Sequence, residues 1–424
     1  MTQSRIFKFF IVPLLFLTLL AGCKQQAGQP NQSAGTGESA PPASTGGSSS
    51  SDPQAPATSD PGASGPSTTP PKSDNGSGSI AKPPAEVRMD KITAVRLADP
   101  KSGWLGGKGW IARTEDGGKT WSPQYSAAGT VEQLFALNGQ EAWAVVGDAG
   151  NKTKPRQLIG TKDGGKTWAA VGTMPNNGFL HFVSSDEAYS GNSKTTDGGK
   201  TWTALPIPEQ TVGDAYFHDR QNGWAVTQDK DMLHVKRTTD GGGAWQNVMS
   251  RKTVAQLTGA IIRSAGADDA WVEWIGESGM TQTSYALFHT ADGGKTWQTV
   301  VANSTAGGGP APGFPIDHSD GPKNSGNKPG ALYVVDPNVA FMGGQCMACD
   351  KPNTIGWTTD GGKTWVNGEA EFAGYGEQLL AIADAKHGWW IVTDNTEPAV
   401  MYTTSDGGKS WQKAHTFEKL QPGS

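Results

Sequence analysis

The sequence predicts an all-β protein, a seven-bladed β-propeller of four-stranded blades that follows a disordered tether. Three observations lead to this prediction. A string of the type TxDGGKTW occurs seven times, a looser strand-forming pattern precedes each copy, and the chain before residue 87 is rich in Ser, Gly, Pro and Thr. The copies recur at intervals of roughly 50 residues on average, which is typical of one propeller blade.

Residues 1–22 are typical of an export signal. Arg5 and Lys8 precede an apolar run over residues 9–20, which is shorter than the roughly 20 residues that a helix needs to cross a bilayer. Ala21 and Gly22 then precede Cys23, and this order resembles the lipobox of bacterial lipoproteins. The resemblance implies removal of residues 1–22, acylation of Cys23, and a lipid anchor on the extracytoplasmic face of the cell membrane. The alternative is an ordinary signal peptide with an unrelated cysteine.

Residues 23–86 predict a flexible tether behind the acylated cysteine. No aromatic residue occurs between Cys23 and Trp104, so this segment cannot bury enough apolar surface to offset the entropy cost of ordering it. A random coil of this length reaches roughly 40 to 45 Å. We expect the folded domain to span residues 87–418, and residues 419–424 to form a short tail.

The seven repeats predict seven tight turns. They occupy residues 114–121, 161–168, 195–202, 238–245, 290–297, 358–365 and 404–411. A carboxylate two residues after a Thr can accept backbone N–H groups, and the glycines after it can adopt positive φ. The Trp that ends each string supplies a large apolar surface for packing between sheets. The aspartates are Asp116, Asp163, Asp197, Asp240, Asp292, Asp360 and Asp406.

These strings resemble the Asp box, or bacterial neuraminidase repeat, S/T-x-D-x-G-x-T-W. The resemblance implies a structural turn between the third and fourth strands of each blade. It therefore assigns the seven aspartates to the scaffold rather than to catalysis.

A second pattern before each repeat predicts the first two strands of each blade. It alternates apolar residues, then has a turn, then an aromatic residue among small neighbours. We call the residues at this position the motif aromatics; they are Trp104, Trp143, Tyr189, Trp224, Trp271, Phe341 and Trp389. The two patterns account for 12 of the 16 tryptophans, and they leave Trp110, Trp274, Trp357 and Trp390. We expect these four to pack in the blades as well.

The double pattern over residues 92–411 resembles the photosystem II assembly and stability factor family and its non-photosynthetic bacterial relatives. The resemblance implies a non-catalytic binding or assembly scaffold for a protein partner, and we expect a monomer. The chain has nine arginines and none after Arg263, so the sequence does not predict a basic docking face. A net charge of -5 also argues against a nucleic-acid partner.

The alternative function is a carbohydrate-binding or glycoside-hydrolysing propeller. A sialidase needs three arginines around the substrate carboxylate, yet the chain has no R-I-P string and no Arg in its last third. The seven histidines are scattered, without an HExxH motif. The sequence therefore predicts no catalytic residue, no metal site and no cofactor.

Irregular loops predict where a partner binds. The interval between Asp292 and Asp360 is the longest between consecutive repeats because of a Gly- and Pro-rich insertion over residues 304–330, and Cys346 and Cys349 follow it. In an oxidising compartment these cysteines are expected to form a local disulfide, with redox activity and a shared metal as alternatives. Loop variation on a fixed scaffold is where function usually lies. The hypothesis places a partner near Phe314, His318, Gln345, Met347 and Asp350.

Overall fold

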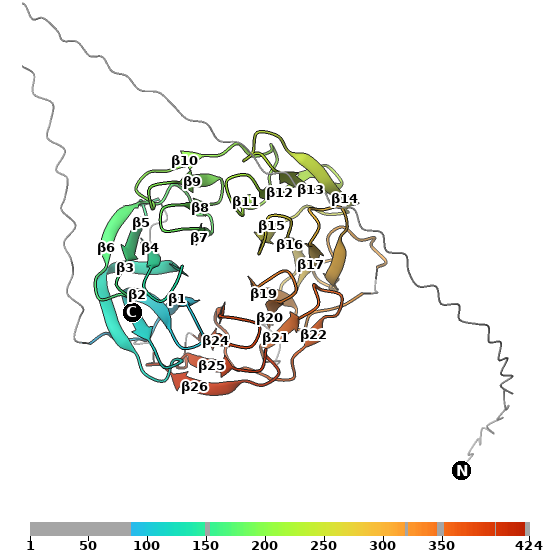
Figure 1. Cartoon of the computed structure of the whole chain (residues 1–424). Helices are drawn as coiled ribbons and strands as arrows, with labels where there is room; N and C mark the ends of the chain where they lie inside the picture. Colours follow the sequence, from blue (N-terminus) through green and yellow to red (C-terminus); the bar gives the residue numbers. More distant parts are fainter. Residues whose placement is uncertain (1–85, 149–152, 319–320, 346–351, 395, 420–424) are drawn as a thin grey trace, which may run out of the picture. The chain divides into compact units, whose positions relative to one another are not determined.

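The structure is a computed structural model that describes residues 86–148, 153–318, 321–345, 352–394 and 396–419. The chain divides into two units, 1–73 and 74–424, and every described residue belongs to the second. The described residues form strands and loops without a helix, and the sheets follow one another around a ring (Figure 1). None of the described segments is a helix long and apolar enough to cross a membrane.

The first sheet contains two blades. Its elements are β1 (Ile92–Leu97), β2 (Gly103–Thr114), β3 (Ser122–Ala136), β4 (Ala142–Gly147), β5 (Gln157–Thr161) and β6 (Ala169–Thr173). Residues 103–107 of β2 pair with β1, whereas residues 108–113 pair with β3. Residues 122–130 of β3 pair with β2, whereas residues 130–136 pair with β4. Because β2 and β3 each fill two strand positions, the six elements provide the eight positions of two four-stranded blades.

Five further four-stranded sheets complete the ring. The third and fourth blades are β7 (Leu180–Phe182), β8 (Ala188–Ser190), β9 (Ser193–Thr195) and β10 (Thr203–Ala204), then β11 (Tyr216–Phe217), β12 (Gly223–Asp229), β13 (Met232–Thr238) and β14 (Gln246–Lys252). The fifth is β15 (Gly259–Arg263), β16 (Ala270–Ser278), β17 (Thr283–Thr290) and β18 (Gln298–Asn303). The last two are β19 (Lys328–Val334), β20 (Ala340–Gln345), β21 (Thr354–Thr358) and β22 (Val366–Asn367), then β23 (Gln378–Ile382), β24 (Gly388–Val392), β25 (Val400–Thr404) and β26 (Gln412–Thr416). The predicted fold class, a seven-bladed propeller of four-stranded blades, is confirmed.

Each repeat forms the turn between the third and fourth strands of its blade, and its aspartate organises that turn. In the fifth blade, Asp292 accepts hydrogen bonds from the backbone N–H of Thr296 at 2.9 Å and from its hydroxyl at 2.6 Å. Gly293 and Gly294 adopt φ of 75° and 86°, which favour glycine. The Gly293 N–H also donates to the Asp268 carbonyl at 2.8 Å. This bond ties the repeat turn to the turn between the first two strands, and the equivalent bond occurs in all seven blades.

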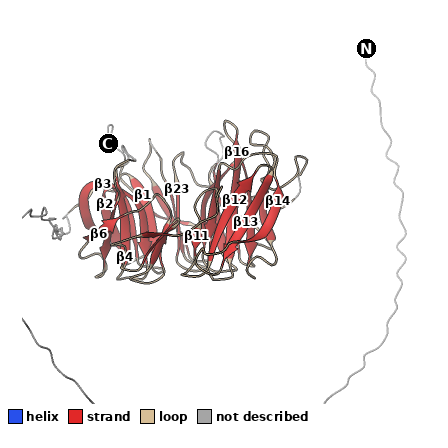
Figure 2. Cartoon of the chain, turned by 90° about the horizontal axis from the view of Figure 1, so that it is seen from above, coloured by secondary structure: helices blue, strands red, loops and turns tan. Residues whose placement is uncertain are grey.

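The hydrophobic core lies between neighbouring blades, whose strands run across the thickness of the ring with loops at both ends (Figure 2). The seven motif aromatics are at most 3% exposed, and the other four tryptophans at most 7%. Repeat tryptophans pack against the preceding blade. Trp297, for example, meets Trp224 edge-on, with ring centroids 6.1 Å apart. The aromatic residues of both patterns therefore serve blade packing.

Three side chains just before a repeat threonine link one blade to the next. The Arg237 guanidinium lies 5.3 Å from the Trp224 ring and donates to the Gly293 carbonyl of the next repeat at 3.2 Å. Arg113 repeats this arrangement between the first two blades. His289 stacks on a motif aromatic at 3.9 Å, and its Nδ1 lies 2.8 Å from the carbonyl oxygen of the next repeat. Hydrogen bonds between neighbouring blades therefore supplement the apolar packing between them.

Within the described residues, the ring closes by side-chain packing rather than by a strand shared between its ends. The first blade begins with β1 and the last blade ends with β26. Side chains of the two blades form one apolar cluster, in which Trp121 and Trp389 lie 5.6 Å apart. The Arg88 guanidinium donates to the Lys419 carbonyl at 2.5 Å. The two ends of the described chain therefore meet at the closure.

Candidate functional site

A cavity of about 840 Å³ occupies the centre of the ring. Its lining includes residues of β1, β3, β7, β11, β15, β19 and β23, the first strand of each of the seven blades. All seven blades therefore contribute to one channel, which makes it the natural place for a ligand.

Six large side chains of this channel come from one equivalent position in the repeats. In every blade, the residue eight positions before the motif aromatic pairs with that aromatic across the first two strands. In six blades this residue lines the channel: Arg96, Phe135, His181, Tyr216, Arg263 and Tyr333. The seventh is Ala381. Two cations and four aromatic rings are thus arranged around the cavity by the repeat itself.

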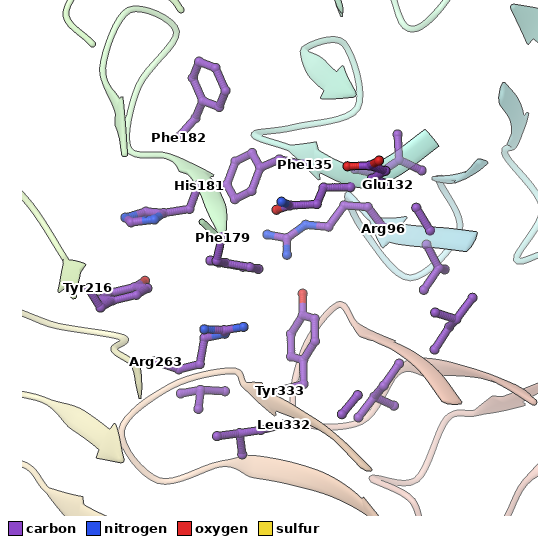
Figure 3. A pocket seen from close by; sticks show the side chains of 18 of the residues that line it. Arg96, Glu132, Phe135, Phe179, His181, Phe182, Tyr216, Arg263, Leu332 and Tyr333 are labelled. Atoms are coloured by element: carbon purple, nitrogen blue, oxygen red, sulfur yellow. The ribbon is translucent and has the colours of Figure 1, made fainter. Parts of the chain in front are cut away.

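Arg96 and Arg263 extend their guanidinium groups into the middle of the channel, near the hydroxyl of Tyr333 (Figure 3). The Arg96 guanidinium lies 4.5 Å from the Phe135 ring centroid and 5.7 Å from that of Tyr333. The Arg263 guanidinium lies 3.8 Å from the ring centroid of Phe179. Cation–π contacts therefore hold both guanidinium groups in place without neutralising them.

Among the described residues, neither channel arginine forms an ion pair. Glu132 lines the channel but pairs with Arg156 at 3.3 Å. Asp219, another lining residue, accepts hydrogen bonds from backbone groups and from the Asn222 amide. Burial lowers the pKa of Arg263, and the positive charge of Arg96 acts in the same direction. The channel therefore holds two positive charges that favour an anion.

Part of the channel lining is aromatic and neutral. His181 stacks on Tyr216 with ring centroids 4.7 Å apart and an angle of 6°. Burial lowers the pKa of His181 to about 3, and the charges of Arg263 and Arg96 add to this effect. His181 is therefore uncharged at neutral pH. Burial also raises the pKa of the Tyr216 hydroxyl, so neither ring supplies charge to the channel.

Two of the described members of the predicted partner site contact each other, and the third has other partners. Phe314 and His318 stack at 4.3 Å, and Phe314 packs on Phe288 of the fifth blade at 5.9 Å. Gln345 instead donates a hydrogen bond to the Gly376 carbonyl at 2.7 Å and lines a second cavity. Met347 and Asp350 lie outside the described residues, as do Cys23, Cys346 and Cys349.

Sequence reasoning missed the channel arginines. It counted few arginines and therefore predicted no basic docking face, whereas the fold brings Arg96 of the first blade and Arg263 of the fifth into one cavity. A signal was present, because both lie eight residues before a motif aromatic. Alternation along a first strand does not reveal which face turns toward the centre of a ring.

No family model and no curated protein matches this chain. Among solved structures, YCF48 from Cyanidioschyzon merolae is similar at 15% identity and a TM-score of 0.46, over 80% of this chain and 98% of that one. A structure of YCF48 bound to D1 peptide has 16% identity and a TM-score of 0.44, over 78% and 97%. The Niastella koreensis GH74 enzyme has 15% identity and a TM-score of 0.35, over 78% and 66%. At identities this low, the likeness to these structures shows a shared fold alone.

Proposed function

We propose that this protein is a non-catalytic binding scaffold whose central channel takes a carboxylate-bearing segment of a protein partner. The observation that carries the proposal is the pair of guanidinium groups, Arg96 and Arg263, held in the channel without an ion pair among the described residues. Guanidinium binds carboxylate through two parallel hydrogen bonds. The surrounding rings offer apolar contacts to the rest of the segment. The resemblance of the double pattern to assembly-factor propellers supports a scaffold role.

The proposal places the propeller on the extracytoplasmic face of the cell membrane, tethered through an acylated Cys23. The support for this placement is the export signal and the lipobox-like order of residues 20–23 in the sequence. The tether lies outside the described residues. The expected result is that Cys23→Ala abolishes incorporation of labelled palmitate and releases the protein from the membrane fraction. If the wild-type protein does not incorporate labelled palmitate, the lipid anchor is contradicted, and the channel proposal is unaffected.

A peptide-binding experiment tests the channel. The full chain is titrated with peptide pairs that differ only in a free or amidated C-terminus, or in Asp or Asn. We expect the carboxylates to bind more tightly, and Arg96→Gln or Arg263→Gln to weaken binding about tenfold or more.

Arg251→Gln is the matched control. Its guanidinium also stacks on rings, at 4.8 Å from Phe288 and 5.0 Å from Phe314, but it does not line the channel. Equal losses in Arg251→Gln and the channel variants, or equal binding of carboxylate and amide peptides, would reject the proposal.

The competing function is action on carbohydrates, and turnover of a glycoside or sialoside by the full chain would overturn the scaffold proposal. Tyr189 and Glu187 are the described residues most similar to a tyrosine nucleophile and its carboxylate partner. The Tyr189 hydroxyl donates to Glu187 at 2.6 Å. Tyr189 is only 1% exposed and its pKa is raised by burial. The second oxygen of Glu187 pairs with Arg220 at 2.6 Å. This environment disfavours an ionised tyrosine, so it supports blade packing over catalysis.

A further inference from the structure

A buried glutamate lies behind one of the channel arginines. Glu273 on β16 is 0% exposed, and neither of its carboxyl oxygens has a hydrogen-bond partner among the described residues. In the pairing of β15 with β16, Ile261 faces Glu273 and Arg263 faces Trp271. Arg263 and Glu273 are therefore diagonal neighbours on one face of the sheet, within reach for two long side chains.

Two side chains that can carry charge are diagonal neighbours of Glu273 in the described sheet: Arg263 on β15, and His289 on β17, whose Nε2 lies 2.8 Å from Asp269. Burial raises the pKa of Glu273 to about 8, against the opposing influence of Arg263. On β17, Tyr285 is buried and accepts a hydrogen bond from Asn303 at 2.9 Å. The sixth blade adds Leu332 and Met342, which are apolar and belong to the same cluster as Ile261 and Tyr285.

Other charged or titratable groups also act on Arg263. They are Asp214 and Tyr216, which raise the pKa of Arg263, and Arg96, which lowers it. The Arg263 guanidinium rests on Phe179 and donates to the Ile262 carbonyl at 2.8 Å, so it is directed to the channel rather than to Glu273. The described position of Arg263 therefore leaves its charge available to a ligand.

We propose that Glu273 and a carboxylate ligand compete for Arg263, so that binding in the channel is coupled to proton uptake by Glu273. This inference rests on the proposed function, because it regulates the same site. When Glu273 is protonated, the ligand receives the full charge of Arg263. When Glu273 ionises, its buried negative charge offsets Arg263 and repels the ligand.

The pH dependence of binding follows from the titration of Glu273, because the other groups at the site keep their charge in this range. A ligand carboxylate is ionised throughout the range above pH 6, and His181, with a pKa of about 3, does not change charge there. Affinity should therefore be highest below pH 8 and fall as pH rises through about 8. Binding near pH 8 should take up a proton.

The test uses the full chain and N-acetyl-phenylalanyl-alanine, with its C-terminal amide as the neutral probe. Calorimetry from pH 6.5 to 9.5 should show that affinity for the carboxylate falls about tenfold in the wild type. Glu273→Gln and Glu273→Met should each abolish this fall. Two variants are used because one still tests the proposal if the other does not fold. Glu277→Gln, which changes an exposed glutamate on the same strand, should keep the wild-type profile.

A measurement without ligand separates the two proposals. Infrared spectra of the full chain at pH 7 should contain the C=O band of a buried protonated carboxyl group, and that band should be missing from Glu273→Gln. Absence of the band in the wild type, or a Glu273→Gln affinity that still falls with pH, overturns the coupling alone. If the peptide binds neither the wild type nor the variants at any pH while the band is present, the proposed function itself fails.

Discussion

At the scale of single residues, each repeat aspartate acts as an acceptor that closes its own turn. Asp292 is typical: the Thr296 hydroxyl and backbone N–H lower its pKa to about 2, and the Thr290 hydroxyl contributes. The other six carboxylates accept the equivalent backbone bond. Because ionised acceptors strengthen such bonds, the fold uses seven exposed or half-buried carboxylates as structural parts.

Asp292→Ala should lower the free energy of unfolding by about 1 kcal/mol at pH 7, because the turn loses charge-assisted hydrogen bonds. The folded-state pKa of Asp292, about 2, lies below its ordinary value near 3.9. Its stabilisation is therefore complete above pH 4 and is lost as pH falls through 2. Urea unfolding of both proteins at several pH values measures the difference. Asp317→Ala, at an exposed loop position, should cost little, and an equal cost would contradict the role of the turn.

At the scale of elements, the insertion between the fifth and sixth blades is part of the packed domain. Ala311 is fully buried and Asn324 is 4% exposed. The Asn324 side chain donates to the Gly343 carbonyl at 3.0 Å and accepts from the Trp365 indole N–H at 3.2 Å. Its backbone N–H donates to the Asn303 side chain at 2.9 Å. One residue of the insertion thus joins the last strand of the fifth blade to the sixth blade.

Asn324→Ala should destabilise the domain by roughly 2–4 kcal/mol, because the Gly343 carbonyl and the Trp365 indole N–H of the sixth blade lose their side-chain partner. Chemical denaturation of the full chain measures this loss. Asn247→Ala is a useful control, because Asn247 bonds only exposed groups on β13 and β14 among its described contacts. A loss no larger than that of the control would mean that the insertion adds no rigidity at the boundary between the two blades.

At the scale of the whole domain, the ring is closed by side-chain packing between complete blades. Every blade has its four strand positions filled by consecutive chain, and the first and last blades meet through the cluster that contains Trp121, Trp389 and Phe417. Residues near the two ends of the described segment meet at this junction, where Arg88 contacts Lys419 and Glu418. The closure is therefore one more inter-blade interface, similar in kind to the other six.

A circular permutant tests this equivalence. A short linker joins residue 419 to residue 86, and new ends are opened between Glu209 and Gln210, in the connection between the third and fourth blades. Because no blade is divided, we expect the same β-sheet circular dichroism and cooperative unfolding. A second permutant opened between Ala286 and Leu287, inside β17, should fold poorly. Equal loss of structure in both permutants would show that the natural junction is special.

The sequence by itself determined the repeating unit, because each turn and each strand pair is encoded by residues that are close together in the chain. The seven strings with Asp, two Gly and Trp predicted the blade number, and the motif aromatics are buried as expected. Only the tertiary structure decided the candidate site. Arg96 and Arg263 are ordinary strand residues until ring closure turns their strands toward a common centre. In the irregular loops, which the sequence favoured as a partner site, Phe314 and Asn324 also contribute to blade packing. Local patterns specify local bonds, whereas convergence across a ring depends on how all seven blades pack.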